Sequence, residues 1–194
     1  ARNNHFTGNL HNDYSCLQAL ERLYLEYNSL TSSIPAYLGS LSALQGLYLQ
    51  QNQLTGPVAD TIYQLPNLRF INFNINQLTS TLPESLCDAN QLELFSIGYN
   101  LLSSTLPSCL GNNTKLVILL LCHNPIYGVL PETYGSMVSL TGLFVNDTAL
   151  TGTLPTSLSN LYKLEELDLP DNYFTGSLPV EYSTLALGAY CLSE

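Results

Sequence analysis

The sequence predicts an α/β solenoid, a stack of short chain coils with strands along one side. A single period, the step from Asn28 to Asn52, runs through the chain without an insertion. An Asn marks each period, an apolar residue keeps the same spacing, and a Pro follows that apolar residue in six of eight periods. Repeats of this length form units that stack on their neighbours. The Asn column reads Asn4, Asn28, Asn52, Asn76, Asn100, Asn124 and Asn172, with Thr148 at the vacant place.

Each period begins with a strand. In Leu23-Tyr24-Leu25 the apolar residues alternate with an outward one, which is the period of a strand. The two inward positions recur in every period, so stacking superposes them into apolar columns. The first column reads Leu23, Leu47, Ile71, Phe95, Leu119, Leu143 and Leu167, and the second Leu25, Leu49, Phe73, Ile97, Leu121, Val145 and Leu169.

The Asn that follows each strand predicts a tight bend. An Asn side chain bonds the backbone groups of such a bend, and stacked Asn residues then connect successive coils. Thr148 interrupts this ladder, so we expect local strain near residues 146–149. Further apolar positions, such as Leu30, Ile34 and Leu38, complete the coil.

Composition excludes several classes of protein. The chain is 45% hydrophobic and 10% charged, with a formal net charge of −10. A disordered chain requires low hydrophobicity and high charge, and five scattered Lys and Arg residues cannot neutralise many phosphates of a nucleic acid. The longest apolar run, residues 116–122, is too short to span a membrane.

The repeat resembles a known family. Residues 44–56, LQGLYLQQNQLTG, look like a leucine-rich repeat, and residues 150–155, LTGTLP, resemble its plant-type extracellular variant. The resemblance covers essentially the whole chain. The Gly of the Thr-Gly pair is replaced at Ser32, Ser80 and Ser104, and the Pro column has exceptions at His11 and Ala59.

This resemblance implies a right-handed leucine-rich-repeat superhelix. Its parallel β-sheet lies on the concave face, with a short second sheet and 3₁₀ turns on the convex side. The relatives to which it points are receptor-like ectodomains and polygalacturonase-inhibiting proteins, so it implies non-catalytic recognition of a protein, a peptide or a cell-wall glycan outside the cell. We expect residues 1–194 to be a single solenoid of about eight 24-residue repeats, and a fragment of a longer chain without its terminal caps.

The cysteines suggest one disulfide. Cys87 and Cys109 are slightly less than one period apart, on the arcs of adjacent coils, so stacking brings them near each other. The alternative is two buried thiols that pack as small apolar groups. Cys122 is expected on the concave face and Cys191 in a core column. No C-x-x-C pair favours a metal site.

Two acceptor motifs for N-glycosylation occur, at Asn112-Asn113-Thr114 and Asn146-Asp147-Thr148. Asn112 is expected on the convex arc, where a glycan is harmless. Asn146 is expected on the concave face, where a glycan obstructs a ligand.

The outward strand residues give the candidate ligand site. They form a tyrosine-rich N-terminal end, an apolar middle and an acidic C-terminal end. Adjacent large apolar groups on a sheet face typify an interface. We therefore expect a protein or peptide there, with a basic segment against the acidic end. The candidate residues are Tyr24, Tyr48, Phe70, Leu94, Ile118, Leu120, Phe144, Asp147, Glu166, Asp168 and Asp171.

Other functions remain open at this point. The apolar concave face also suits a structural subunit docked in a larger assembly, and the acidic end could hold Ca²⁺, although a solvated rim is the plainer interpretation. Outward Thr and Ser pairs on the second sheet resemble ice-binding arrays, but Pro57, Tyr127 and Val129 interrupt them. His5, His11 and His123 have no nucleophile and carboxylate at recognisable spacing, and no Gly-rich phosphate loop indicates a cofactor.

Overall fold

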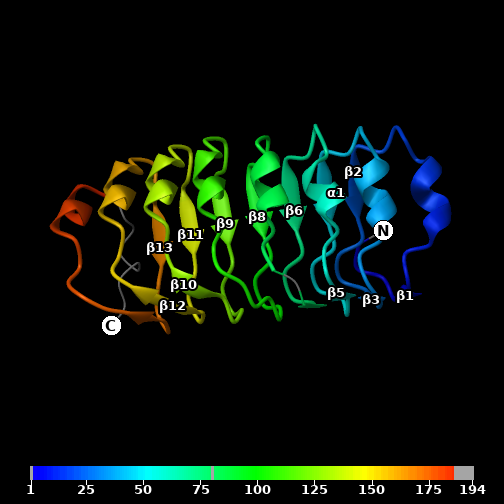
Figure 1. Cartoon of the computed structure of the whole chain (residues 1–194). Coiled ribbons are helices and arrows are strands. Elements are labelled where there is room, and N and C mark those ends of the chain that lie inside the picture. The colour runs from blue at the N-terminus through cyan, green and yellow to red at the C-terminus, as the bar shows by residue number, and fades with distance from the viewer. Residues whose placement is uncertain (1, 80, 186–194) are drawn as a thin grey trace.

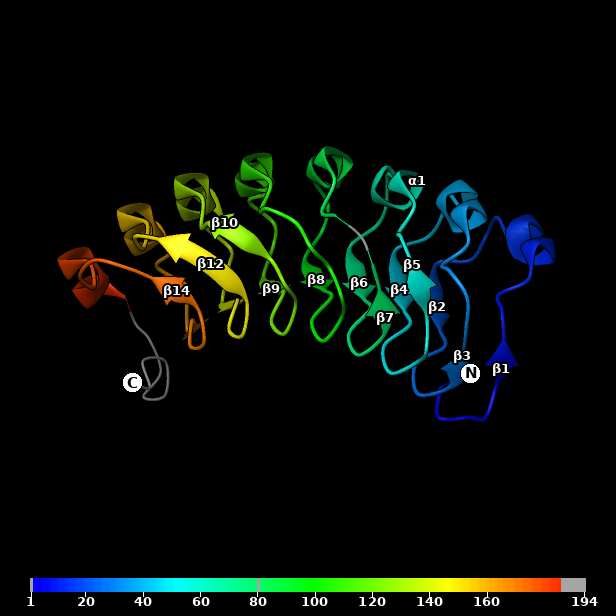
Figure 2. The same cartoon turned by 60° about the horizontal axis from the view of Figure 1, so that its bottom comes forward.

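The computed structural model describes residues 2–79 and 81–185. The coils stack side by side into an arc, with the two ends of the chain at its opposite ends (Figure 1). Short helical turns follow the outer edge of the arc and strands lie inside it (Figure 2). The predicted leucine-rich-repeat fold is confirmed.

A parallel sheet lines the concave face. Its seven strands in the described residues follow the chain order, and each pairs with the strand one period further on, for example Leu23 with Leu47. The register therefore equals the sequence period. The strands are β2 (Arg22–Tyr24), β4 (Gly46–Tyr48), β6 (Phe70–Asn72), β8 (Leu94–Ser96), β9 (Ile118–Leu120), β11 (Gly142–Phe144) and β13 (Glu166–Asp168).

The expected second sheet exists in the described residues as three separate pieces. Its strands pair at an offset slightly shorter than the period, for example Thr7 with Ser29. They are β1 (Thr7–Gly8) with β3 (Ser29–Leu30), β5 (Thr55–Gly56) with β7 (Gln77–Leu78), and β10 (Tyr127–Val129) with β12 (Ala149–Gly152) and β14 (Tyr173–Phe174). Pro125 has no N–H to donate to the preceding coil, and residues 101–104 of that coil, which stand between β7 and β10, form no strand.

Helical turns cover the convex side, and one of them is α-helical. A Pro precedes six of the eight turns in the part of the chain that the structure describes, and its carbonyl accepts the N–H three residues later, as from Leu38 to Pro35. His11 and Ala59 stand at the two remaining starts. The turns are η1 (Asn12–Cys16), η2 (Ala36–Ser40), α1 (Asp60–Tyr63), η3 (Glu84–Asp88), η4 (Ser108–Asn112), η5 (Glu132–Ser136), η6 (Thr156–Asn160) and η7 (Val180–Thr184).

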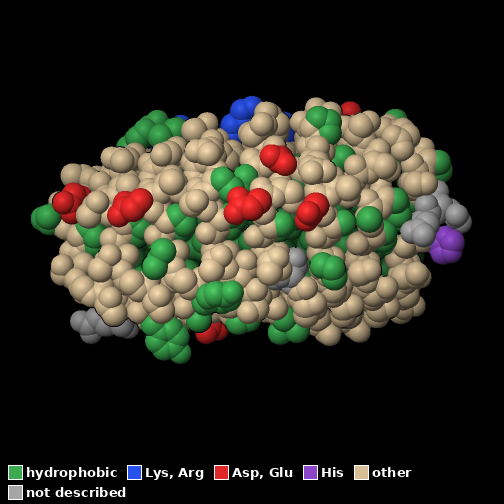
Figure 3. Space-filling model, in the orientation of Figure 1, with side chains coloured by type: hydrophobic (Ala, Val, Ile, Leu, Met, Phe, Trp, Pro, Cys, Tyr) green, Lys and Arg blue, Asp and Glu red, His purple; other side chains and the backbone are tan. Residues whose placement is uncertain are grey.

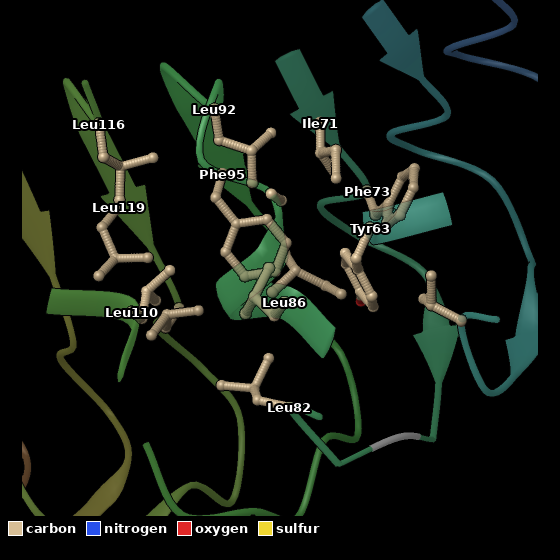
Figure 4. Close-up of a cluster of buried hydrophobic side chains, with 14 of the residues drawn as sticks. Tyr63, Ile71, Phe73, Leu82, Leu86, Leu92, Phe95, Leu110, Leu116 and Leu119 are labelled. Atoms are coloured by element: carbon tan, nitrogen blue, oxygen red, sulfur yellow. The ribbon is translucent and has the colours of Figure 1, made fainter. Parts of the chain in front are cut away.

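The core runs between these two layers. Leu47, Ile71, Phe95 and Leu119 are fully buried, as the first apolar column predicts. Figure 4 shows side chains of neighbouring coils, such as Phe95 and Leu86, pointing into the same layer. A coil that stood alone would expose these groups, so the stack provides the hydrophobic stabilisation. Cys191, expected in a core column, lies outside the described residues.

The Asn ladder forms as predicted. In Asn100 the amide Nδ2 donates to the carbonyls of Phe73, Ile97 and Gly98, and Oδ1 accepts the N–H of Leu78. Each Asn thereby satisfies backbone groups of its own coil and of the preceding one.

Thr148 is accommodated by other hydrogen bonds. Its hydroxyl contacts the carbonyl of Val145 and Oδ1 of Asn172. At other ladder positions the Asn side chain accepts a backbone N–H of the preceding coil, and an Asn at position 148 would accept that of Ile126. With Thr148 there, the N–H of Ile126 donates instead to the carbonyl of Asn124, at 2.7 Å. This γ-turn around Pro125 replaces the missing ladder bond.

Candidate functional site

The N-terminal end of the concave face carries an aromatic stack. The rings of Tyr24 and Tyr48 lie 4.7 Å apart and nearly parallel, and Phe70 follows at 6.5 Å from Tyr48. The glycine at Gly46 makes room for this stack, because a Cβ there would lie 2.8 Å from the Tyr48 ring. Strand spacing of about 4.8 Å brings such rings into contact.

Two guanidinium groups adjoin the stack. Arg22 lies 6.0 Å and Arg69 5.2 Å from the Phe70 ring centre, both within the reach of a cation–π interaction. Arg69 also forms an ion pair with Glu93, at 2.5 Å. Burial, then the neighbouring Tyr24, raises the pKa of Tyr48, and Arg22 opposes this shift. The hydroxyl of Tyr48 therefore stays protonated and can donate a hydrogen bond.

Sequence reasoning missed two buried oxygens in the coils that carry Tyr24 and Tyr48. Oε2 of Glu26 and Oε1 of Gln50 have no hydrogen-bond partner, although Glu26 is only 4% exposed. Both residues stand at the same place in successive coils. Each residue lies two positions after the end of a strand, and its polar side chain was the only signal in the sequence, because burial at this place has no sequence signature.

The predicted apolar middle forms a continuous surface, but its side chains are less exposed than the sequence predicts. Leu94, Ile118, Leu120 and Phe144 are half-buried on the strands of the concave sheet. A Cβ on Gly142 would lie 2.6 Å from the Phe144 ring, and one on Gly98 would lie 2.4 Å from Leu120. Because these two glycines have no side chain, the large side chains of Phe144 and Leu120 can lie close against the sheet. Cys122 is buried here, and burial raises its pKa to about 11.

The acidic residues separate into two groups. Glu166 and Asp168 lie on β13, on the concave face. Asp147 and Asp171 instead occupy turns after the strands, with φ of 49° and 56°. We call the first group, together with Tyr24, Tyr48, Phe70, Leu94, Ile118, Leu120 and Phe144, the concave strip.

The left-handed turns form a rim along the edge of the concave face. In the described residues, eight successive coils place a non-glycine residue there with positive φ, a conformation that non-glycine residues rarely adopt. Within the rim His123 stacks on Tyr99 at 3.9 Å and pairs through Nδ1 with the carboxylate of Asp147. The rim consists of Asn3, Tyr27, Gln51, Ile75, Tyr99, His123, Asp147 and Asp171.

Cys87 and Cys109 form a disulfide between η3 and η4, with their Cα atoms 5.6 Å apart. Oε2 of Glu84 lies 2.9 Å from Sγ of Cys109. In the described part of the chain, Glu84, Cys87 and Cys109 form a close cluster of residues of the types that bind metal ions. With both sulfurs in the disulfide, only the carboxylate remains to ligate, which is too few donors for a zinc site.

The two glycosylation motifs differ in accessibility. Asn112 ends η4 on the convex side and is exposed, as is Thr114. Asn146 is half-buried, and the hydroxyl of Thr148 is engaged in hydrogen bonds. The Thr and Ser pairs expected on the second sheet are exposed, but the sheet is divided into three pieces, and Ser103 and Thr105 lie in a coil without a strand, so the pairs form no continuous flat array.

Charge is distributed unevenly over the surface. Acidic side chains follow one another along the helical-turn face (Figure 3), and first-turn carboxylates occur at Asp60, Glu84, Glu132 and Glu181. An apolar hollow of about 350 Å³ lies between the first two coils, where Leu23 and Leu25 are only half-buried. The helices of the described residues have four or five residues, too few to cross a membrane.

Comparison with known proteins supports the family resemblance. The leucine-rich-repeat family model matches residues 19–41 and 163–185. No curated protein matches the chain significantly. Among solved structures, a TDR receptor is 30% identical with a TM-score of 0.91, over 93% of this chain and 31% of that chain.

Two other solved structures bear on function. The leucine-rich-repeat ectodomain of the Arabidopsis receptor kinase HAESA, in complex with a peptide hormone, is 26% identical with a TM-score of 0.90, over 93% of this chain and 30% of that chain. A plant ice-binding protein is 20% identical with a TM-score of 0.68, over 96% and 70% respectively, a likeness of fold alone. The chain spans about a third of the length of the two receptor ectodomains.

Proposed function

We propose that this chain, a solenoid of leucine-rich repeats similar to the ectodomains of plant receptors, is a non-catalytic module that binds a protein or peptide along its concave strip, outside the cell. The observation that carries the proposal is the strip itself. Aromatic and aliphatic groups from Tyr24 to Phe144 follow one another across the strands, and two carboxylates end the series.

The chemistry of the strip favours an extended polypeptide. The aromatic rings and the half-buried leucines offer apolar contacts, the kind that dominate the energy of protein interfaces. Glu166 and Asp168 at the C-terminal end favour a basic segment of the ligand by charge complementarity. The HAESA ectodomain binds a peptide hormone on the same fold, which supports this choice of ligand class.

A displayed library of random peptides tests this proposal. We expect selection on the wild-type chain to enrich peptides that combine apolar and basic residues. Synthetic copies of these peptides should then bind the double variant Phe70→Ala with Phe144→Ala at least about tenfold more weakly, because two large contacts are lost. Isothermal titration calorimetry measures this loss.

A matched control keeps the test specific. Tyr127→Ala with Val129→Ala removes two exposed apolar groups from the second sheet and leaves the concave strip intact. Peptides that bind this variant and the Phe70/Phe144 variant equally well would exclude the concave strip. If the purified chain instead forms a stable oligomer in which the concave strip is buried, the alternative of a structural subunit replaces the proposal of a ligand-binding module.

Location outside the cell predicts a glycan at Asn112. This residue is exposed at the end of a turn, and an acceptor motif there is open to the glycosylation enzymes. Peptide mass spectrometry of protein secreted from a eukaryotic host should find a sugar on Asn112 and an oxidised Cys87–Cys109 pair. Reduced cysteines with an unmodified Asn112 argue against secretion.

A further inference from the structure

A shallow hollow lies beside the rim, where the repeat departs from its own pattern. Its volume is about 310 Å³, and its walls are His123, Asn124, Pro125, Asp147, Thr148, Ala149 and Tyr173. This volume is at the lower end of the roughly 300–1,000 Å³ of small-molecule sites, so it suits one or two side chains of a polypeptide rather than a larger ligand. We call it the rim hollow. It is distinct from the concave strip, with which it shares no residue.

The hollow results from the small size of Ala149. The residue after the ladder position is Pro125 in the preceding coil and Tyr173 in the following one. Ala149 between them is half-buried, whereas Tyr173 is 69% exposed. A methyl group between two larger side chains leaves a depression with an apolar floor, a ring of Pro on one side and an aromatic ring on the other.

The polar wall of the hollow is acidic. Asp147 contributes a carboxylate whose partner is Nδ1 of His123, and its side chain remains 56% exposed. None of the residues that line the hollow is Lys or Arg. A carboxylate beside an exposed tyrosine ring suits an ammonium or guanidinium group, which gains both an ion pair and a cation–π contact.

The backbone holds this wall in place. The N–H of His123 donates to the carbonyl of Asn146 at 3.1 Å, and the N–H of Asp147 donates to the carbonyl of Pro170 at 2.9 Å. The His123 ring is fixed further by its stack on Tyr99. A wall that is ordered before binding reduces the entropic cost of binding.

We propose that the rim hollow binds a polypeptide segment in which a Lys or Arg stands next to an apolar residue. The apolar side chain lies on Ala149 between Pro125 and Tyr173, and the cation lies against Asp147. The hollow thus adds a second contact point for a partner, outside the concave strip, and does not depend on the strip binding anything.

The test uses N-acetyl-leucyl-arginine amide as a probe, with N-acetyl-leucyl-glutamate amide and N-acetyl-glycyl-arginine amide as comparison probes. An NMR titration of ¹⁵N-labelled protein should shift the amides of His123, Thr148 and Ala149 with the first probe. We expect much smaller shifts with the other two, because each lacks one half of the motif.

Two variants locate the binding. Ala149→Leu fills the hollow and should weaken the leucyl-arginine probe at least about fivefold, whereas Gln53→Leu introduces the same residue at the same place of another coil and should leave binding unchanged. Asp147→Asn should weaken it about two- to fivefold, the worth of an exposed ion pair, and Glu181→Gln on the convex side should not.

The outcomes separate this proposal from the concave-strip proposal. Equal shifts from the arginine and glutamate probes, or equal binding to the Ala149→Leu and Gln53→Leu variants, overturn the rim hollow. The Phe70/Phe144 variant should bind the leucyl-arginine probe normally even where it loses the selected peptides. Comparison of the ¹⁵N spectra of all variants shows that each is folded.

Discussion

A single ladder asparagine, Asn100, satisfies backbone groups of two successive coils. Asn100 is 5% exposed and makes four hydrogen bonds to backbone groups of two coils. The substitution Asn100→Ala leaves these groups buried without partners. We expect it to lower the free energy of unfolding by about 2–4 kcal/mol, as measured by urea denaturation.

Asn28 provides the comparison. It occupies the same ladder position, but it is less buried and accepts the N–H of Phe6 near the surface. Water can replace its bonds, so Asn28→Ala should cost less than half as much. Equal losses for the two variants would show that packing around the side chain, rather than backbone satisfaction, determines the cost.

Cys122 predicts a pH dependence in the alkaline range. Burial, then the nearby Asp168, raises the pKa of its thiol from 9.0 to about 11. A group whose pKa is raised on folding stabilises the protein fully below the unfolded value, and this contribution is lost as pH rises from about 9 to 11. Wild-type stability should therefore fall faster across this range than that of Cys122→Ala, by about 1–3 kcal/mol.

Urea denaturation at pH 7, 9, 10 and 11 measures this difference. Tyr63 and Tyr134, whose pKa values burial also raises, are present in both proteins and cancel in the comparison. Parallel stability curves for the two proteins above pH 9 would mean that the thiol ionises on the folded protein as freely as on the unfolded chain.

At the scale of an element, three of the helical turns carry a glycine where they closely approach the next coil, at Gly39, Gly111 and Gly135. A Cβ on Gly135 would lie 2.3 Å from the carbonyl oxygen of Ser157 in η6. The backbone of η6 is held there by the bond from Oγ of Ser157 to the carbonyl of Glu132. Gly135→Ala should therefore cost about 1–3 kcal/mol, since the two turns must move apart.

Ser159→Ala is the matched control for this prediction. Ser159 stands at the same place in η6 and already carries a Cβ, and its hydroxyl bonds only within its own turn. Its removal should change the melting temperature little. If the Gly135→Ala and Ser159→Ala proteins have the same melting temperature, the spacing between coils adjusts to the added Cβ without measurable cost.

The second sheet shows where local sequence overrides the repeat. The resemblance implies one short sheet, whereas the described residues form three pieces. Pro125 removes a donor and Thr148 removes an acceptor from neighbouring coils, and the γ-turn around Pro125 compensates for the missing acceptor by satisfying the N–H of Ile126. Each substitution was visible in the sequence, but its compensation depended on a local backbone geometry that no periodicity describes.

At the scale of the whole molecule, the repeat period predicts the fold but not the details of the candidate site. The repeat spacing predicts the strand register, the buried columns and the Asn ladder, because each coil repeats one environment. The site depends on residues that differ from coil to coil. The half-burial of Leu120 and Phe144 followed from the glycines beside them, and the left-handed turns of the rim place Asp147 after the strand rather than on it. Such details depend on backbone angles rather than on the pattern.

The stack also predicts how the molecule unfolds. The element contacts of the described residues join neighbouring coils, so stability is a sum of coil and interface terms, as in other repeat proteins. Native-state hydrogen exchange should therefore be slowest in the central strands β6, β8 and β9 and faster in β2 and β13 at the ends. Asn100→Ala should raise exchange in β7, where Leu78 loses its bond, and in β6 and β8, which are followed directly by the other residues that Asn100 bonds, and it should leave β13 nearly unchanged. An equal rise in every strand would instead show that the coils open only together, and that the interfaces are far stronger than the weakest coil.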